Sequence, residues 1–451
     1  MTGKEECLRF LKKAVQESSA DQTEALLLTE DSSLTRFSRS AVHQHVAERN
    51  RTLILRVVLG KRIAVVTTNM LHTDSVGALL QKAIVMAKAL PPNEQFHSLP
   101  EPKFIPAVNT YCGAIDRLTP ERKVKILKDL IRQMTPKGLE VSGAFSNGVV
   151  ECAVVNSLGV EAYQLYSDLV LHFISEGEKN TGYAHFVGRD PEELNLEKLA
   201  EEAARKVTDE EPIQVEPGEY EVILEPLAVS ELLDFLSFLG LHALALQEER
   251  SFLCGSIGKK MLDEKVTLYD DGLDAAGLQI PFDFEGLPKQ KVIFFENGIA
   301  RGVTYDSLTA GREGKESTGH GLISPNTAGP VPINLIMKQG DSTLGEMVKS
   351  VRRGIYVTRF HYSNVVEPMK AVVTGMTRDG TFLIENGEIT RPVKNLRFTE
   401  SVLKALSRVS AISRERKICT EGTVYSRRFI TGTVAPAIKV DGFNFSGVSA
   451  L

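Results

Sequence analysis

The chain has 451 residues, of which 42% are hydrophobic and 25% charged, with 35 glycines and 19 prolines. These values are ordinary for a folded globular protein, and the length predicts two large domains rather than one core. The formal net charge of −5 leaves no basic stripe for phosphate groups, so we expect no nucleic-acid partner.

The cysteines and the first residues of the chain indicate a cytoplasmic protein. The five cysteines are scattered without a Cys-x-x-Cys pair, which is typical of reduced thiols in a cytosol. The first fifteen residues carry charge throughout and lack the apolar core of a signal peptide. No stretch approaches the ~20 apolar residues of a membrane helix, so we expect no membrane partner.

The first half of the sequence mixes helical and β-rich patterns. Apolar residues at helical spacing, and helix-start signals such as Thr119 followed by Pro120, predict helices over 5–18, 75–90, 119–134 and 191–207. Runs rich in β-branched residues predict strands over 25–30, 34–39, 51–58, 62–68, 139–145, 149–156, 159–175 and 180–187. This order predicts an α+β domain in which helices pack on an antiparallel sheet.

An acidic run with two prolines between Thr208 and Gly218 is typical of a linker and divides the chain into residues 1–217 and 218–451. After it we expect a strand over 220–224 and one long helix over about 228–247. The rest is predicted to be strands and turns with short helices, over 304–311, 344–351 and 400–405. The fold class is therefore α+β, with an N-terminal antiparallel sheet and packed helices followed by a β-rich C-terminal domain with one long helix.

Two Asn-Gly pairs, Asn297-Gly298 and Asn386-Gly387, lie between β-rich runs. Each pair predicts a β-hairpin with a type I′ turn, in which both central residues have positive φ. The hairpin sequences KVIFFENGIARGV and GTFLIENGEITRPV, together with YDDGL, FDFEGLP, YDSLTAGREGKESTGHG and GIYVTRFHYSN, resemble the TldD/PmbA family. The resemblance spans most of the chain and is specific mainly from Tyr220 onward. It implies a metalloprotease assembly that cleaves unfolded peptides, held in extended form along strand edges in a cleft.

The long helix departs from the family's metal-binding pattern. The resemblance implies that proteolytic members carry HExxxH on this helix, with histidine ligands for zinc and a glutamate. Here the corresponding positions are Asp234, Phe235 and Leu239, and the only histidine on the helix is His242, which we expect to be a packing residue. The chain thus resembles the metal-free PmbA (TldE) branch, which implies no cofactor in this chain and zinc in a TldD-type partner.

Two other histidines are candidates for substrate binding. His320 lies between glycines, which we expect to expose the imidazole, and His361 ends a predicted strand before Tyr362 and Asn364. We predict that His320, His361, Tyr362 and Asn364 contact the peptide substrate, and that this chain supplies no catalytic residue.

Several alternatives stay open. The chain forms a dimer either with a TldD-type subunit or with a second copy of itself. It could instead be an independent metal-dependent hydrolase, with His320 and His361 joined by Glu367 or Asp379, although single ligands so far apart in sequence are a weak signal. A third alternative is a non-enzymatic binding protein, as the family's older name of gyrase modulator suggests.

Overall fold

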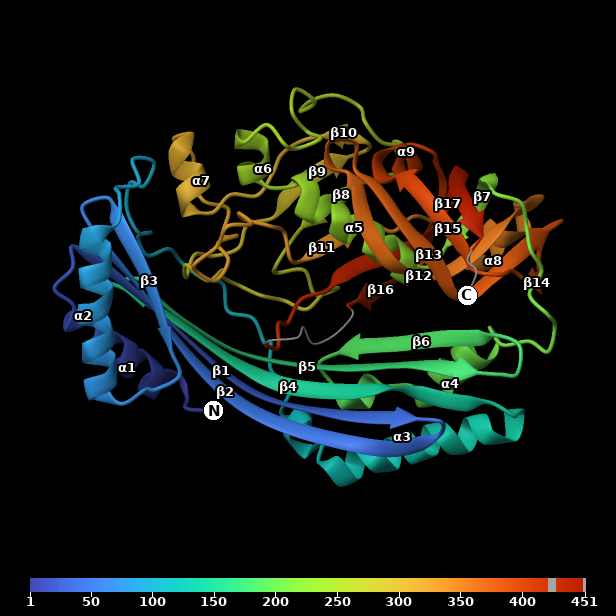
Figure 1. Ribbon diagram of the computed structural model, residues 1–451, viewed down its shortest axis with the longest axis horizontal. Helices are drawn as coiled ribbons and strands as arrows, with labels where there is room; N and C mark the ends of the chain where they lie inside the picture. Colours follow the sequence, from blue (N-terminus) through green and yellow to red (C-terminus); the bar gives the residue numbers. More distant parts are fainter. Residues whose placement is uncertain (421–426, 449–451) are drawn as a thin grey trace.

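The computed structural model describes residues 1–420 and 427–448, and Figure 1 shows one half of the chain above the other. The first half is built on a six-stranded antiparallel sheet with the order β3-β2-β1-β4-β5-β6. Its strands are β1 (Gln22–Ser38), β2 (Ala41–Leu59), β3 (Arg62–Thr68), β4 (Glu140–Asn156), β5 (Glu161–Glu176) and β6 (Thr181–Gly188).

Both faces of this sheet are covered. One face packs against helices α1 (Lys4–Gln16), α2 (Thr73–Ala89), α3 (Pro120–Met134) and α4 (Leu196–Ala204). Successive side chains of a strand point to opposite faces. On β1, Ala25 and Leu27 therefore pack with α1 and α2, whereas Leu26 and Leu28 pack with the second half of the chain. An apolar core thus joins the two halves.

The second half contains an eleven-stranded sheet, part of which closes on itself. Strands β7, β12, β13, β15 and β17 pair in that order, and β17 also pairs with β7. Phe360, Phe398 and Phe443 from three of these strands pack together, with the ring centres of Phe360 and Phe398 4.3 Å apart.

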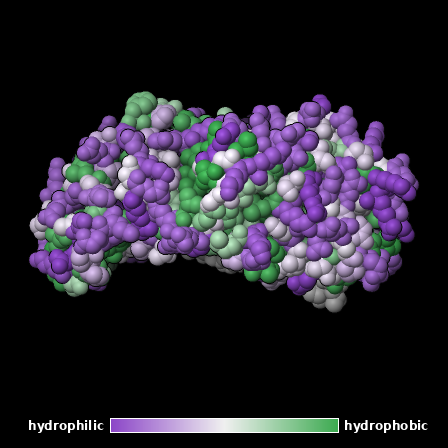
Figure 2. Space-filling model, turned by 90° about the horizontal axis from the view of Figure 1, so that it is seen from above, coloured by the Kyte–Doolittle hydropathy of each residue, from purple (hydrophilic) through white to green (hydrophobic). Residues whose placement is uncertain are grey.

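Figure 2 shows that, on the face seen from above, hydrophobic residues gather over the middle of the molecule and hydrophilic residues lie at both ends.

The elements of the second half follow the predicted order. The strands are β7 (Gly218–Leu224), β8 (Leu268–Asp270), β9 (Val292–Glu296), β10 (Ile299–Ala300), β11 (Leu335–Met337), β12 (Arg353–Glu367), β13 (Val372–Glu385), β14 (Glu388–Pro392), β15 (Leu396–Ser401), β16 (Val409–Cys419) and β17 (Thr433–Val448). The helices are α5 (Pro226–Gly240), α6 (Ala243–Gln247), α7 (Ser307–Arg312), α8 (Leu344–Lys349) and α9 (Val402–Leu406).

Both predicted hairpins are present. Asn297 and Gly298 join β9 to β10 with φ values of 50° and 76°, and Asn386 and Gly387 join β13 to β14 with φ values of 51° and 84°. Positive φ at both central residues confirms the type I′ turns. The α+β fold class is confirmed as well.

Two pairs of predicted short strands are instead single long strands. The predicted strands 25–30 and 34–39 both fall in β1, which ends at Ser38, and the predicted strands 139–145 and 149–156 both fall in β4, which begins at Glu140. The polar residues between the short runs are satisfied inside the sheet: Ser33 Oγ donates to Asn147 Oδ1 at 3.0 Å, and the buried Lys123 of α3 donates to both. Among the described residues, no helix combines the length and apolar character needed to cross a membrane.

Candidate functional site

Helix α5 lies where the family's metal motif is expected. Pro226 occupies the first turn of α5, where no backbone N–H is needed. The buried face of α5 packs into the core of the second half. Asp234 and Phe235 line a hollow on the other side, whereas Leu239 is only 5% exposed and belongs to the core. The Asp234 carboxylate accepts a hydrogen bond from the Thr433 hydroxyl. A phenylalanine, a core leucine and one hydrogen-bonded carboxylate do not fit a zinc site.

His242 is a buried packing residue, as predicted, but it also ends the predicted long helix. It is the N-cap of α6: its Nδ1 accepts the Ala245 N–H at 3.4 Å, and its Nε2 donates to the Phe238 carbonyl oxygen at 3.2 Å. Both ring nitrogens are therefore used, and burial lowers the pKa of His242 to about 4. The helix expected over 228–247 is in fact two helices, because the capping geometry of His242 interrupts it.

A hollow of about 490 Å³ lies between α5 and β12, and we call it the α5–β12 hollow. Leu227 and Phe238, near the two ends of α5, both line it, so it follows most of the helix. Its lining residues are Tyr183, Leu227, Ser230, Glu231, Asp234, Phe235, Phe238, Arg359, Phe360, His361, Tyr362, Ser363 and Thr420.

Strand β12 borders this hollow along the edge opposite β13. On one side β12 pairs with β13 along nearly its whole length. On the other side it pairs with β7 only from Gly354 to Val357, and within residues 1–420 and 427–448 no strand continues that pairing. The reason is local, because the Glu225 N–H donates to the Val357 carbonyl oxygen at 2.9 Å and α5 begins at the next residue. Alternate backbone N–H and C=O groups beyond Val357 therefore point away from β13, toward α5.

An ion pair next to the hollow, through its contacts with β6, joins the two halves of the chain. Arg359 Nε donates to Asp379 Oδ2 at 2.7 Å, and the guanidinium lies 4.6 Å from the ring centre of Tyr183 on β6. The other carboxylate oxygen of Asp379 accepts from the Thr181 hydroxyl at 2.7 Å. Asp379 has a φ of 53° and lies in a bulge of β13. Arg359 was not among the predicted site residues, although it lies within the GIYVTRFHYSN motif.

The hollow contains two of the four predicted substrate-binding residues. His361 and Tyr362 line it, and their rings make a T-shaped contact with centres 4.5 Å apart. Tyr362 is 74% exposed and has a φ of 53°, within a bulge between His361 and Asn364. Asn364 is exposed on β12 but is not among the residues that line the hollow.

The expected exposure of His320 is wrong. Its side chain is 1% exposed, with Nε2 2.9 Å from Asp270 Oδ1 and Nδ1 3.0 Å from the Thr318 carbonyl oxygen. Gly319 explains the burial: a Cβ there would lie 2.2 Å from the Pro288 carbonyl oxygen, so glycine lets the chains approach and draws His320 inward. Burial and the nearby Lys289 lower the pKa of His320.

The structure does not assemble the alternative metal site. Glu367 pairs with Lys370 at 2.8 Å, Asp379 is held by Arg359, and His320 lies outside the lining of the α5–β12 hollow. Within the part of the chain that the structure describes, no group of three His, Cys, Asp or Glu residues is placed to hold a metal ion. The geometry gives the independent hydrolase no support.

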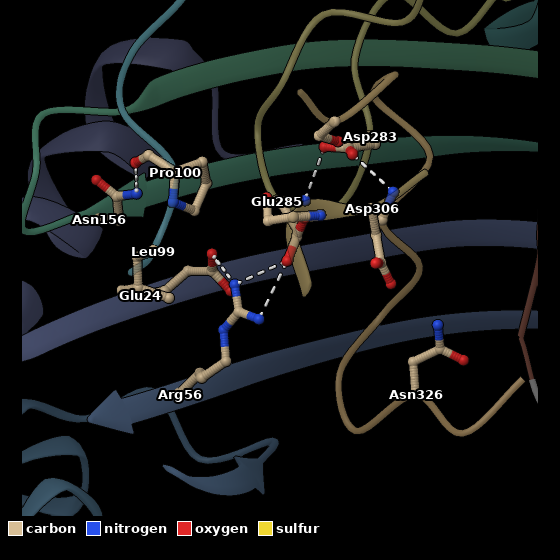
Figure 3. A network of polar contacts seen from close by, with 12 residues as sticks. Glu24, Arg56, Leu99, Pro100, Asn156, Asp283, Glu285, Asp306 and Asn326 are labelled. Atoms are coloured by element: carbon tan, nitrogen blue, oxygen red, sulfur yellow. Dashed lines mark hydrogen bonds and ion pairs between the residues drawn. The ribbon is translucent and has the colours of Figure 1, made fainter. Parts of the chain in front are cut away.

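A second polar network at the junction of the halves had no sequence signal. Arg56 on β2 lies between Glu24 on β1 and Glu285 of the second half, with contacts of 2.7 and 3.1 Å (Figure 3). Glu285 also accepts the Ser307 N–H at the start of α7 at 3.0 Å. Burial, followed by the charge of Glu285, raises the pKa of the neighbouring Asp283 to about 8. The FDFEGLP motif contains both acids, but nothing near Arg56 in the sequence indicates its partner.

Comparison with known protein families decides which family this is. The model of the PmbA/TldA metallopeptidase C-terminal domain matches residues 217–447, and that of the central domain matches residues 113–209. The first match alone covers more than half of the chain. The chain belongs to the TldD/PmbA family of metallopeptidases. The resemblance seen in the sequence is thereby confirmed.

Relatives in the TldD/PmbA family share the fold. A metalloprotease TldD homolog from Buchnera aphidicola is 28% identical over 288 residues, which make up 60% of this chain and 58% of that relative. The chain thus spans less than two thirds of the length of that relative. TldE from Thermococcus kodakarensis has a TM-score of 0.87 at 23% identity, covering 98% of this chain and 99% of that one. A Thermotoga maritima protein, named as a candidate modulator of a DNA gyrase, has a TM-score of 0.84 at 19% identity, with 97% and 99% covered.

Proposed function

We propose that this chain is a metal-free, PmbA (TldE)-type subunit of a metalloprotease assembly, in which it helps to form the cleft that binds unfolded peptides. The observation that carries the proposal is the face of α5 beside the hollow. It keeps the position of the family's metal helix but presents Asp234 and Phe235 where ligand and base are expected, and it buries Leu239. Zinc, and with it the activated water, is then supplied by a TldD-type partner.

The edge of β12 beyond its pairing with β7 supports the peptide-binding role. An extended peptide that adds to a strand edge is held through backbone hydrogen bonds, so many sequences bind and folded chains are excluded. From Thr358 to Ser363 this edge spans about 17 Å at roughly 3.3 Å per residue, the length of several peptide residues. His361 and Tyr362 project from the same stretch and are positioned to contact the bound peptide. His320 is buried and is not included in this proposal.

The metal content of the chain is the first test. We expect elemental analysis of the chain, expressed in zinc-supplemented medium, to find far less than one zinc per chain. About one zinc per chain that is lost on His320→Ala or His361→Ala would refute the proposal and favour the independent hydrolase.

The second test is reconstitution. The isolated chain is expected to cleave no unfolded peptide, and cleavage should require both this chain and a zinc-bearing family member recovered with it from the source cells. Light scattering should then report a dimer. Full activity of the zinc-bearing member without this chain would refute the shared cleft, and recovery of gyrase alone would favour the binding-protein alternative.

A further inference from the structure

We propose that Arg428 is a positioning residue through which the N-terminal sheet holds one wall of the α5–β12 hollow in place. The inference deepens the proposed function and rests on it, because it treats the hollow as part of the peptide cleft. It gives strands β1, β4 and β5 a part in shaping that cleft, although none of these three strands lines the hollow.

A socket in the N-terminal sheet holds the Arg428 side chain. Arg428 is 4% exposed, and its Nε and Nη2 atoms donate to the two carboxylate oxygens of Asp168 on β5 at 2.6 and 2.8 Å. Gly148 on β4 lies directly opposite Asp168, and a Cβ there would lie 2.6 Å from the Arg428 Cδ atom, so glycine leaves the room that the side chain needs. The Arg428 backbone N–H also donates to Glu30 Oε2 on β1 at 3.0 Å. Three neighbouring strands therefore fix both the side chain and the backbone at this position.

The socket fixes a geometry more than it adds stability. The paired hydrogen bonds between a guanidinium and a carboxylate allow one relative orientation of the two groups. A buried ion pair contributes little net stability compared with well-packed apolar residues of similar volume. The Nη1 atom of Arg428 has no hydrogen-bond partner among the described residues, which lowers the net gain further. The main effect of the socket is therefore to orient the chain at Arg428.

A short, packed segment leads from Arg428 to the start of β17. The ring centres of Phe429 and Phe284 lie 5.4 Å apart, and Ile430 is buried in the core that joins the two halves. Strand β17 then begins at Thr433. A close-packed segment transmits a displacement instead of absorbing it. The orientation of the chain at Arg428 therefore affects the position of Thr433.

The start of β17 contacts the side of α5 that faces the hollow. The Thr433 hydroxyl donates to the Asp234 carboxylate, and Thr433 pairs with Cys419 at the end of β16. The Cys419 thiol is in turn hydrogen-bonded with the Ser230 hydroxyl, one turn before Asp234 on the helix. Ser230 and Asp234 both line the hollow. A shift at the start of β17 therefore reaches two positions of the hollow wall.

Hydrogen–deuterium exchange of the full-length chain, read by mass spectrometry, tests the proposal without any peptide substrate. Arg428→Met should speed amide exchange in α5 about tenfold, while exchange in β7 of the same half should change less than about twofold. Arg427→Met is the matched control and should change neither, because the Arg427 guanidinium lies 3.8 Å from the Glu30 carboxylate and is partly exposed. Arg428→Lys keeps the charge but loses the paired hydrogen bonds, so its effect should be smaller than that of Arg428→Met.

A double-mutant cycle tests the path through β17. Thr433→Val removes the hydroxyl that reaches Asp234 and should speed exchange in α5 by itself. Added to Arg428→Met it should change the rate by less than about twofold more, because both substitutions break the same path. Fully multiplicative effects of the two substitutions would overturn transmission through β17.

The comparison of α5 with β7 separates positioning from a purely structural role. Equal acceleration in both elements, or unchanged exchange in α5, would overturn the proposal. If Arg428→Met does not fold, Arg428→Lys and Thr433→Val carry the same comparison. Zinc content and peptide cleavage are measured separately, so a failure of the proposed function and a failure of this inference are told apart.

Discussion

Replacing Arg56 should loosen the junction between the two halves of the chain. Arg56 lies directly opposite Glu24 in the register of β1 and β2 and also contacts Glu285 from the second half. Arg56→Met keeps most of the side-chain volume but leaves two buried carboxylates without their cation. Breaking a buried ion pair from one side costs about 3–5 kcal/mol, because an uncompensated charge stays in the interior.

The same two strands offer a matched control. Arg49 also lies directly opposite an acid of β1, Asp31, and its Nη2 is 2.6 Å from the carboxylate, but this pair is exposed. Exposed pairs contribute only about 0–1 kcal/mol, so Arg49→Met should change stability little. The two substitutions share their chemistry, their strand and their partner strand, and they differ in burial.

Urea denaturation followed by circular dichroism, at pH 5 and pH 8, measures the difference. Burial already raises the pKa of Glu24 in the wild type, and loss of Arg56 raises it further. An acid whose pKa is raised on folding gives stability that is lost as pH rises, so the Arg56→Met defect should be larger at pH 8 than at pH 5. Equal losses for Arg56→Met and Arg49→Met, or a defect that shrinks at pH 8, would refute this account.

Two further predictions concern pH and backbone conformation. Burial lowers the pKa of His185 to about 3, so its contribution to stability is present above pH 6.5 and lost as pH falls; we expect a loss on the order of 2 kcal/mol between pH 7 and 5. His185→Gln, which can still donate to the Ile418 carbonyl oxygen, should flatten this dependence in denaturation curves at the two pH values. Gly298→Ala should destabilise the protein by at least about 2 kcal/mol more than Gly60→Ala. Both glycines have positive φ, but a Cβ at Gly298 would lie 2.2 Å from the Leu262 carbonyl oxygen, whereas a Cβ at Gly60 would have no atom within 4 Å. Thermal unfolding of the two variants checks this, and equal melting temperatures would contradict it.

The features that the sequence predicted correctly depend on neighbouring residues. The Asn386-Gly387 turn needs only residues that accept positive φ, and the Thr119 side chain accepts the Arg122 N–H at the start of α3 as its position suggested. The lengths of β1 and β4 depended on tertiary contacts, since Lys123 reaches polar groups of both strands from a separate helix.

The errors at the site have the same origin. His320 was expected to be exposed because it lies between glycines, yet its position is decided by Asp270, fifty residues earlier in the chain. The Arg56 network joins residues 229 positions apart. The positive φ of Tyr362 had no sequence signal, because a tyrosine in the left-handed region contradicts local preference and is found only by seeing the backbone.

The short connection between β7 and α5 affects how the protein avoids aggregation. An open strand edge normally invites the edges of other sheets, which leads to sheet-to-sheet association. Here the edge of β12 beyond Val357 faces helix α5 instead of open solvent, with the hollow between them. The edge of a folded sheet brings its neighbouring strands and covering layers with it, so it is too thick to enter a hollow of about 490 Å³. The short β7–α5 connection therefore shields this part of β12 from the edges of other folded sheets.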